Sequence, residues 1–316
     1  MQKRMLGRTG LEIAPLVFGG NVFGWTADEK TSFGLLDAWV DAGLDAIDTA
    51  DIYSAWAPGN KGGESETIIG KWLAARPANR DKITLITKVG SEFSKEKKGL
   101  SERWIMQAVE DSLRRLQTDH IDLYLSHWFD PATPYEETLG AYQKLKEQGK
   151  VRAIGASNLN AEQLAESLEV ARSKGLPRYD VLQPEYNLYD RAAFDGALSE
   201  LAIREDIGVI TYYSLASGFL SGKYRSKADL SKSVRGTRVA KYLDARGARI
   251  LEALEQAAQS LDASMAEVAL AWVMARPGVT APIASATTQR QLESLVRSVS
   301  LELGPAQQAL LDAASR

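Results

Sequence analysis

Short apolar runs alternate along this chain with longer stretches in which apolar residues recur every three to four positions. The short runs have strand length and are rich in leucine or β-branched residues, and the longer stretches have the spacing of amphipathic helices. We expect eight strands, at residues 14–20, 44–48, 83–88, 121–127, 151–157, 179–183, 207–213 and 279–284. A helical stretch follows each of them, so the pattern is one of eight consecutive strand–helix units.

Two of the helical stretches carry clear end signals. Residues 101–117 begin with Ser101, whose hydroxyl group can accept a hydrogen bond from a backbone N–H of the first turn. Residues 160–175 begin with Asn160, which can cap in the same way, and end with Gly175, which tolerates the left-handed backbone that ends many helices. These signals predict two well-bounded helices.

Eight consecutive strand–helix units predict a closed parallel barrel, a (β/α)8 TIM barrel, with its helices outside. The segment KRMLGRTGLEI at the start of the chain contains a turn-forming GRTG and predicts a β-hairpin that caps the barrel floor. A doubly wound sheet with a dinucleotide fingerprint is the competing plan, but Gly19, Gly20 and Gly24 do not fit G-x-G-x-x-G. We expect a single barrel domain over residues 1–316.

Composition narrows the possible partners. The chain is 45% hydrophobic and 25% charged with a net charge of −3, which gives no broad attraction to nucleic acid or to an anionic membrane. It has no cysteine and two histidines, so neither a thiol nucleophile nor a clustered metal site is expected. The first residues do not have the pattern of a signal peptide, and no apolar run has the length of a membrane span. A cytoplasmic protein is the expectation.

Polar residues stand where the predicted strands end. In barrels of this kind, the chemistry lies at the carboxyl-terminal ends of the strands. The strand ends of this chain supply Asp48, Lys88, His127, Ser157 with Asn158, Gln183 and Tyr212, and Tyr53 follows Asp48 closely. The intervals between them are barrel-repeat lengths, so we expect all of these side chains to face one mouth.

The residue types in this series suit one kind of reaction. A phenol with its reference pKa of about 10 is a poor proton donor at neutral pH, and a neighbouring lysine ammonium group is expected to lower that pKa. A carboxylate beside the lysine would keep it charged, and a neutral imidazole could orient a substrate oxygen. Tyr53, Lys88, Asp48 and His127 therefore suit protonation of a carbonyl group, or the reverse. Because no side chain donates hydride, a cofactor has to supply it.

Five segments in order carry a strong resemblance to a known family. They are LDAIDTADIYSAWAPGNKGGESETIIGKWL, LITKVG, DHIDLYLSHWFD, VRAIGASN and TYYSLASGFLSGKYR. Together they resemble the aldo-keto reductase superfamily, and the likeness runs almost from end to end of the chain. Members of that family are (β/α)8 barrels that reduce carbonyl groups with NAD(P)H.

The resemblance implies a role for each matching residue. Tyr53 would be the proton donor, Lys88 and Asp48 its tuning pair, and His127 the group that orients the substrate. Ser157, Asn158 and Gln183 would hold the nicotinamide carboxamide, and Tyr212 would stack on the nicotinamide ring. The loop that wraps the pyrophosphate would contribute Ser214, Leu215, Ser217, Gly218, Gly222 and Lys223.

The last strand–helix turn departs from the family pattern. Ser285 stands where the family often has glycine, and Thr287 and Thr288 stand where an arginine is frequent. Gln291 is retained, with Arg290 beside it. The resemblance implies NADPH as the cofactor, bound at this turn by Ser285, Thr287 and Gln291, and the departure leaves NADH possible.

Four aromatic residues follow strand ends within a few positions. Trp25, Trp56, Trp128 and Phe129 are expected either to line a substrate pocket of apolar or ring character or to pack in the core. Residues 222–241 hold seven Lys or Arg residues against one acid, which predicts a solvated loop or one that covers the cofactor.

Other charged residues have simpler interpretations. His120 precedes a strand, so we expect it at the barrel floor in a structural role. Asp51 is expected to be a turn carboxylate. Glu64 and Glu66 open a helix, where negative charge suits the helix dipole.

The expected function is NAD(P)H-dependent reduction of aldehydes or ketones to alcohols, with a small-molecule carbonyl or alcohol as the substrate. One alternative is an NAD-dependent sugar or polyol dehydrogenase. The other is a non-catalytic NADPH-sensing subunit, like the channel-associated members of the same superfamily. Long partner-facing extensions would favour the subunit, and the pattern predicts none outside the barrel.

Overall fold

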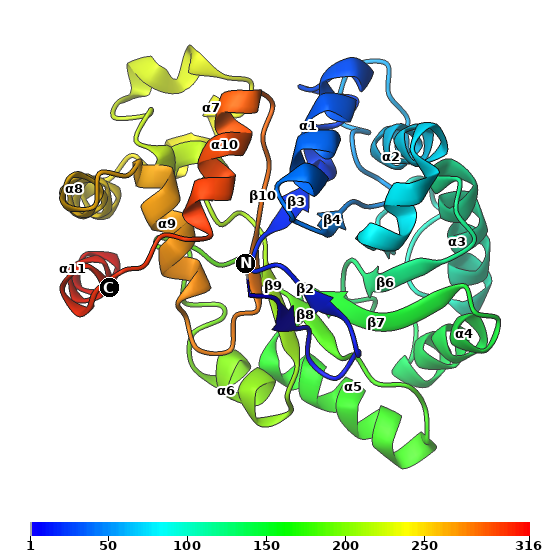
Figure 1. Cartoon of the computed structure of the whole chain (residues 1–316). Coiled ribbons are helices and arrows are strands. Elements are labelled where there is room, and N and C mark those ends of the chain that lie inside the picture. The colour runs from blue at the N-terminus through cyan, green and yellow to red at the C-terminus, as the bar shows by residue number, and fades with distance from the viewer. Residues whose placement is uncertain (1) are drawn as a thin grey trace.

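The computed structural model describes residues 2–316, and its eight central strands close into a parallel barrel (Figure 1). The strands are β3 (Val17–Gly19), β4 (Ala46–Asp48), β5 (Thr84–Val89), β6 (Ile121–Ser126), β7 (Val151–Ser157), β8 (Val181–Gln183), β9 (Gly208–Thr211) and β10 (Ala281–Ala284). Neighbours in sequence pair in order, and β10 returns to pair with β3, with Ile283 opposite Val17. The predicted eight-stranded barrel is confirmed.

Helices surround the barrel, as Figure 1 shows. They are α1 (Glu29–Asp41), α2 (Glu64–Ala75), α3 (Glu102–Leu116), α4 (Tyr135–Glu147), α5 (Ala161–Lys174), α6 (Ala197–Arg204), α7 (Gly236–Val239), α8 (Ala245–Ser260), α9 (Met265–Met274), α10 (Gln289–Ser298) and α11 (Pro305–Ser315). Short 3-10 turns lie at Gly20–Val22, Pro77–Lys82, Ala216–Ser221, Lys227–Lys232 and Ala240–Tyr242.

The three predicted helix ends are confirmed. The side chain of Ser101 accepts a hydrogen bond from the backbone N–H of Trp104 and so caps α3. Asn160 and Gln163 form a reciprocal capping box at the start of α5, and Gly175 ends that helix with a left-handed φ of 64°. Local polar groups therefore fix these helix boundaries.

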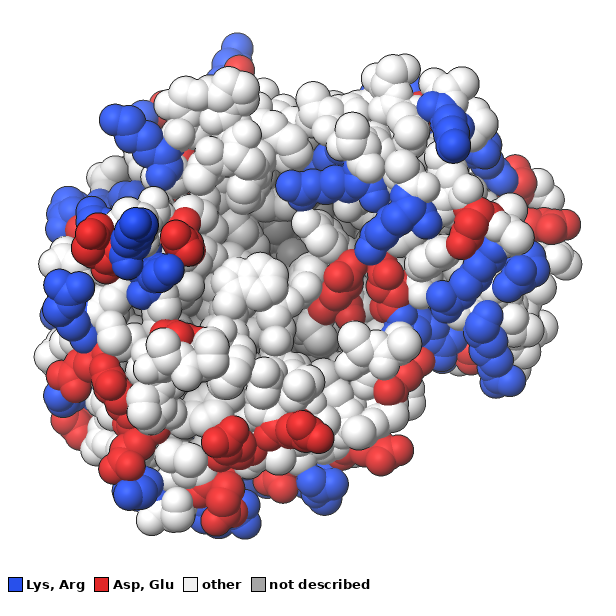
Figure 2. Space-filling model, turned by 180° about the vertical axis from the view of Figure 1, so that it is seen from behind, with Lys and Arg blue, Asp and Glu red and all other residues white. Residues whose placement is uncertain are grey.

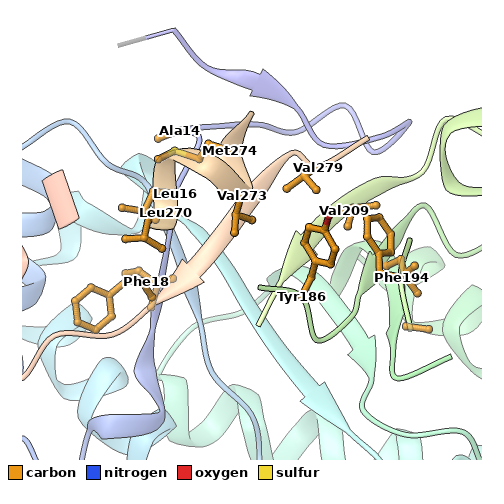
Figure 3. Packing of buried hydrophobic residues seen from close by; sticks show 14 of the residues in the cluster. Ala14, Leu16, Phe18, Tyr186, Phe194, Val209, Leu270, Val273, Met274 and Val279 are labelled. Atoms are coloured by element: carbon orange, nitrogen blue, oxygen red, sulfur yellow. The ribbon is translucent and has the colours of Figure 1, made fainter. Parts of the chain in front are cut away.

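Strand side chains alternate between the barrel interior and the layer under the helices, as a period of two requires. The interior cluster contains Val17, Ala46, Ile86, Leu123, Leu125, Ala153, Val181, Ile210, Ala281 and Ile283. The outward-facing cluster contains Phe18, Ile47, Leu85, Tyr124, Ile154, Leu182 and Val209 together with the inner faces of the helices. Figure 3 shows part of this outer layer, where Leu16 beside β3 packs near Leu270 of α9.

A two-stranded hairpin covers the amino-terminal end of the barrel. Strands β1 (Arg4–Met5) and β2 (Glu12–Ile13) pair antiparallel, and Leu6 packs into the interior cluster. Gly7 has a φ of 56°, and a Cβ atom there would lie 2.4 Å from the carbonyl oxygen of Asp180, so only glycine fits this close approach. The predicted hairpin at the barrel floor is confirmed.

Within residues 2–316, no helix combines the length and the apolar character needed to cross a membrane. In the same part of the chain, no group of three or more His, Cys, Asp or Glu residues is placed to hold a metal ion.

Candidate active site

A layer of polar side chains lies directly above the apolar barrel interior, at the carboxyl ends of the strands. Asp48 stands two residues beyond the inward-facing Ala46, and Lys88 two residues beyond Ile86. Each other member of the layer likewise stands two or four residues beyond an inward-facing apolar residue of its strand. These members are His127, Ser157, Gln183, Tyr212 and Ser285. Because side chains alternate along a strand, this step from apolar to polar directs the whole layer into one mouth. Figure 2 shows the face opposite to that of Figure 1, and this face of the molecule is hollowed near its centre.

Four of the predicted residues come together in this layer. The Lys88 ammonium lies 2.7 Å from both carboxylate oxygens of Asp48 and 3.0 Å from the hydroxyl of Tyr53. The Tyr53 hydroxyl lies 3.4 Å from Asp48, and the rings of Tyr53 and His127 are 6.0 Å apart. Asp48 and Lys88 are fully buried, whereas Tyr53 keeps partial exposure. A phenol therefore stands at the surface of a buried ion pair.

The turn after β4 carries Tyr53 to this position. The chain leaves β4 at Asp48, and Lys88 also donates a hydrogen bond to the carbonyl oxygen of Thr49, at 2.7 Å. Ser54 adopts a left-handed φ of 74° and donates from its hydroxyl to the carbonyl oxygen of Phe23, at 2.6 Å. These bonds hold the turn on both sides of Tyr53.

The electrostatics of Tyr53 differ from the expectation. The sequence predicts that Lys88 lowers the pKa of the phenol, but burial and the Asp48 carboxylate raise the pKa of Tyr53 well above its usual range. The reason is that the charge of Lys88 is already matched by Asp48. Burial also lowers the pKa of Lys88, and burial together with Lys88 places the pKa of His127 well below its usual range. Tyr53 is therefore a neutral phenol and His127 a neutral imidazole.

The residues expected to bind the carboxamide belong to the same hydrogen-bond network. Gln183 donates from Nε2 to the Asp48 carboxylate at 2.8 Å, and Ser157 donates to the carbonyl oxygen of Gln183 at 2.8 Å. Asn158 donates to the Ser157 hydroxyl at 3.0 Å and accepts from the hydroxyl of Tyr212 at 2.6 Å. Of the two adjacent tyrosines, Tyr212 packs against the barrel interior. The network extends the polar layer across the mouth.

The loop expected to wrap a pyrophosphate bends sharply after β9. Ala216, Ser217 and Gly218 have successive left-handed φ angles of 48°, 57° and 94°. The N–H groups of Ala216 and Gly218 donate to the carbonyl oxygens of Tyr213 at 2.6 Å and of Leu215 at 2.8 Å, so the bend is closed by its own hydrogen bonds. This bend is flanked by the remaining predicted members, Ser214, Leu215, Gly222 and Lys223.

The last strand–helix turn is held by local hydrogen bonds. Ser285 donates from its hydroxyl to the side-chain oxygen of Asn21 at 2.8 Å. Gln291 accepts from the backbone N–H of Thr287 at 2.8 Å, and Thr288 caps α10. The serine that replaces the family glycine thus connects this turn to Asn21, which sequence reasoning did not single out.

Three of the four candidate pocket aromatics surround the polar layer. Trp56 lies edge-on to both Trp25 and Tyr53, with ring centroids 5.8 Å apart in each pair. Trp128 stacks on His127 at 5.6 Å. Phe129 follows the other expectation, since it packs against the hydrophobic core and contacts the ring of Tyr135 of α4.

Two functional candidates were missed from the sequence. The hydroxyl of Ser91, in the loop after β5, lies 3.0 Å from Nδ1 of His127. The guanidinium of Arg235 lies over the ring of Trp25 at 5.3 Å, and its Nη2 is buried with no hydrogen-bond partner in the described part of the chain. The basic composition of residues 222–241 was the signal for Arg235, and nothing in the sequence marked Ser91.

Asp51 and Glu66 lie where the sequence predicts, in the turn after β4 and in the first turn of α2, but both are buried. The carboxylate oxygens of Asp51 have no hydrogen-bond partner among residues 2–316. Burial and the nearby Glu66 raise the pKa of Asp51 well above its usual range. Glu66 is itself buried and accepts hydrogen bonds from Thr87 at 2.6 Å and Arg115 at 2.6 Å.

His120 lies where the sequence predicts. It immediately precedes β6, at the amino-terminal end of the barrel, and its Nδ1 is 2.7 Å from Asp119. The floor position separates it from the polar layer, which leaves His127 as the histidine of the mouth.

Known proteins resemble this chain along almost all of its length. The matching family is described as the Aldo/keto reductase family, and the match covers residues 15–316. The uncharacterized oxidoreductase YrpG of Bacillus subtilis (strain 168) is 37% identical over 313 residues, which span 96% of this chain and 92% of that protein. The aldo-keto reductase YhdN of the same organism is 33% identical over 306 residues, 93% of this chain and 88% of that protein. A probable voltage-gated potassium channel subunit beta of Oryza sativa subsp. japonica is 32% identical over 300 residues, 92% and 89% of the two chains.

Proposed function

The chain belongs to the aldo/keto reductase family, and on that premise we propose that it is an NAD(P)H-dependent oxidoreductase that reduces aldehydes or ketones to alcohols. One observation carries the proposal. The Tyr53 hydroxyl lies 3.0 Å from the buried Lys88 ammonium, at a mouth that it shares with a neutral His127. This arrangement places a proton donor, a charge stabiliser and an orienting group around one position.

In the proposed reaction Tyr53 gives its proton to the carbonyl oxygen. Its raised pKa keeps the phenol protonated until that oxygen gains negative charge, which makes the oxygen a strong base. Once the proton leaves, Lys88 stabilises the phenolate across 3.0 Å, and Asp48 keeps the ammonium in place. His127 orients the substrate oxygen beforehand.

The residues of the mouth fit a nicotinamide dinucleotide. A reduced nicotinamide, when bound, supplies the hydride that no side chain can give. Ser157, Asn158, Gln183 and Tyr212 would hold the nicotinamide. The pyrophosphate would meet the loop of residues 214–223 and the guanidinium of Arg235, whose Nη2 has no hydrogen-bond partner within residues 2–316 and so suits an anion. Ser285, Thr287 and Gln291 would meet the adenosine, and NADPH is the cofactor we propose.

Two alternatives use the same site differently. An NAD-dependent sugar or polyol dehydrogenase would run the reaction toward the carbonyl, with Tyr53 as the base. A non-catalytic NADPH-sensing subunit gains some support from the relative named as a probable potassium channel subunit beta. The complete contact set of Tyr53, Lys88, Asp48 and His127 favours the catalytic proposal over the subunit.

The test is absorbance at the reduced-nicotinamide band. Purified protein would receive NADPH or NADH with aromatic aldehydes, α-diketones, ring ketones and open-chain sugars. We expect Tyr53→Phe to lose turnover by a factor on the order of 10² to 10⁴ while it still binds the nucleotide in a fluorescence titration. Tyr135→Phe, the same change on α4, should leave turnover unchanged.

The outcomes separate the alternatives. Equal background rates in the wild type and Tyr53→Phe, with tight NADPH binding, would favour the sensing subunit. Faster turnover with NAD⁺ and polyols than in the reductive direction would favour the dehydrogenase. Failure to bind either nucleotide would reject the proposal.

A further inference from the structure

Ser91 and Trp128 together hold the imidazole ring of His127. The Ser91 hydroxyl lies 3.0 Å from Nδ1 of His127, and Trp128 donates from Nε1 to the same hydroxyl oxygen at 3.2 Å. The indole ring of Trp128 also stacks on the imidazole, with an interplanar angle of 11°. Ser91 and His127 are both buried. The imidazole is therefore held both in its plane and across its face.

The donors and acceptors of this group allow one protonation pattern. A hydroxyl group has one proton and two lone pairs, whereas an indole N–H can only donate. Trp128 therefore occupies a lone pair of Ser91, and the Ser91 proton is free to bond to Nδ1 of His127. If Nδ1 carried a proton, Ser91 would accept two N–H groups and its own proton would have no acceptor among residues 2–316.

The other imidazole nitrogen remains available. A neutral imidazole that accepts at Nδ1 carries its proton on Nε2. Burial and the Lys88 charge keep the pKa of His127 well below its usual range, so the ring is neutral at physiological pH. No hydrogen bond of Nε2 occurs within the described chain, and the ring lies 6.0 Å from that of Tyr53. An Nε2–H group can thus donate into the mouth.

We propose that Ser91 is a positioning residue that holds His127 as the tautomer with its proton on Nε2. Trp128 supports this role, because its donation to the Ser91 hydroxyl oxygen directs the Ser91 proton toward Nδ1 of His127. The catalytic consequence rests on the proposed function, whereas the tautomer itself does not. The indole N–H is occupied by its hydrogen bond to Ser91, so Trp128 presents an aromatic surface to the substrate rather than a hydrogen-bond donor.

The tautomer can be measured directly. The chain has two histidines, so a long-range ¹H–¹⁵N correlation spectrum of ¹⁵N-histidine-labelled protein contains two imidazole patterns, and His120 serves as the internal reference. We expect a single Nε2–H pattern for His127 in the wild type. Ser91→Ala should replace it by a mixture of tautomers, and Ser91→Thr, which keeps the hydroxyl, should preserve it. Ser94→Ala makes the same change in the same loop and should not alter His127.

Kinetics supply a second readout. Ser91→Ala should lower kcat roughly tenfold, by the contribution of one hydrogen bond and the loss of orientation, with a smaller change in KM. The acid limb of the kcat profile should move to higher pH, because the neutral imidazole loses the hydrogen bond that stabilises it. Ser91→Thr should restore most of kcat, and Ser94→Ala should match the wild type.

Several outcomes would overturn the inference. An Nδ1–H pattern for His127 in the wild type would reject it outright, whatever the variants do. An unchanged tautomer in folded Ser91→Ala would reject it as well. If Ser91→Ala loses the Nε2–H pattern but Tyr53→Phe keeps full turnover, the positioning role of Ser91 is supported and the proposed reductase function is rejected.

Discussion

The two ends of the barrel bury carboxylates in different ways. At the floor, Asp45 and Asp122 each accept a backbone N–H, from Ala14 and Leu85. Lys3 and Arg152 reach these carboxylates from solvent, and Arg80, the second partner of Asp122, is 14% exposed. At the mouth, every donor to Asp48 within the described residues is a side chain, and its partner Lys88 has no exposed surface, whereas Arg152 at the floor is 60% exposed. The floor carboxylates tie strands together, and the mouth carboxylate controls the charge of its neighbours.

Backbone conformation follows the same division. Ser54, Asn158, Tyr213, Ala216 and Ser217 follow strands at the mouth and have left-handed φ angles. Such conformations cost stability at residues with side chains and are tolerated where the surrounding structure determines them. At the floor, Gln117 and Asp206 also have left-handed φ angles, of 51° and 53°, and the close approach of the hairpin is made by a glycine, Gly7. The mouth therefore holds more of these strained residues than the floor does.

The largest expected effect is that of Lys88→Met. It should abolish most turnover, because the phenolate loses its stabilising charge, and it should lower the free energy of unfolding by about 3–5 kcal/mol, because Asp48 is left buried without a cationic partner. Turnover and urea unfolding measure the two effects. Adding Asp48→Asn should recover much of the stability without activity, since a neutral amide then replaces the buried charge. Recovery of turnover in the double variant would contradict the contrast between the two ends.

A smaller effect is expected at the floor. Asp122→Ala should cost about 3 kcal/mol in urea unfolding, because Arg80 and the Leu85 N–H both lose a buried partner. The kcat of the folded variant should stay within about twofold of the wild type, since the change lies far from the proposed chemistry. Arg152→Ala is the matched control and should cost under about 1 kcal/mol, as expected for an exposed partner. A large fall in kcat of fully folded Asp122→Ala would erase the distinction.

The smallest effect concerns the pH dependence of stability at the mouth. Burial and the nearby Asp190 raise the pKa of Glu185 to about 7, so the native state holds a proton that the unfolded chain releases near pH 4.3. The contribution of this group to stability is complete below about pH 4.3 and is lost as pH rises through about 7. Glu185→Gln should therefore show a smaller fall in Tm between pH 5 and pH 8 than the wild type. Glu169→Gln, at an exposed ion pair, should behave as the wild type, and identical Tm profiles for all three proteins would exclude this assignment.

The fold could be predicted because its pattern is repetitive. A short apolar run indicates each strand, and apolar periodicity together with capping residues indicates each helix. Six of the eight predicted strands are longer than the observed ones, as 207–213 is against Gly208–Thr211 for β9, whereas 151–157 matches β7. The apolar pattern of the sequence indicates which residues are buried. Buried residues continue beyond the last residue of a strand that pairs with its neighbour in the barrel.

Part of the site could be predicted for the same reason. Asp48, Lys88 and His127 continue the inward alternation of their strands, so strand ends alone indicate that they meet. Ser91 and the burial of Asp51 depend on how loops after different strands approach one another, which no local pattern encodes. The direction of the Tyr53 pKa depends on distances among three charged or polar groups, so the sequence alone suggested the opposite sign.

The pairing of β10 with β3 has a consequence for synthesis on the ribosome. Ile283 pairs with Val17, so the first barrel strand keeps one open edge until β10 has been translated, more than 260 residues later. Contacts between such distant residues form slowly, and an unpaired strand edge can associate with another nascent chain. Translation that stops before residue 281 would leave a seven-stranded open sheet with two such edges, so the four residues of β10 decide whether the ring can close.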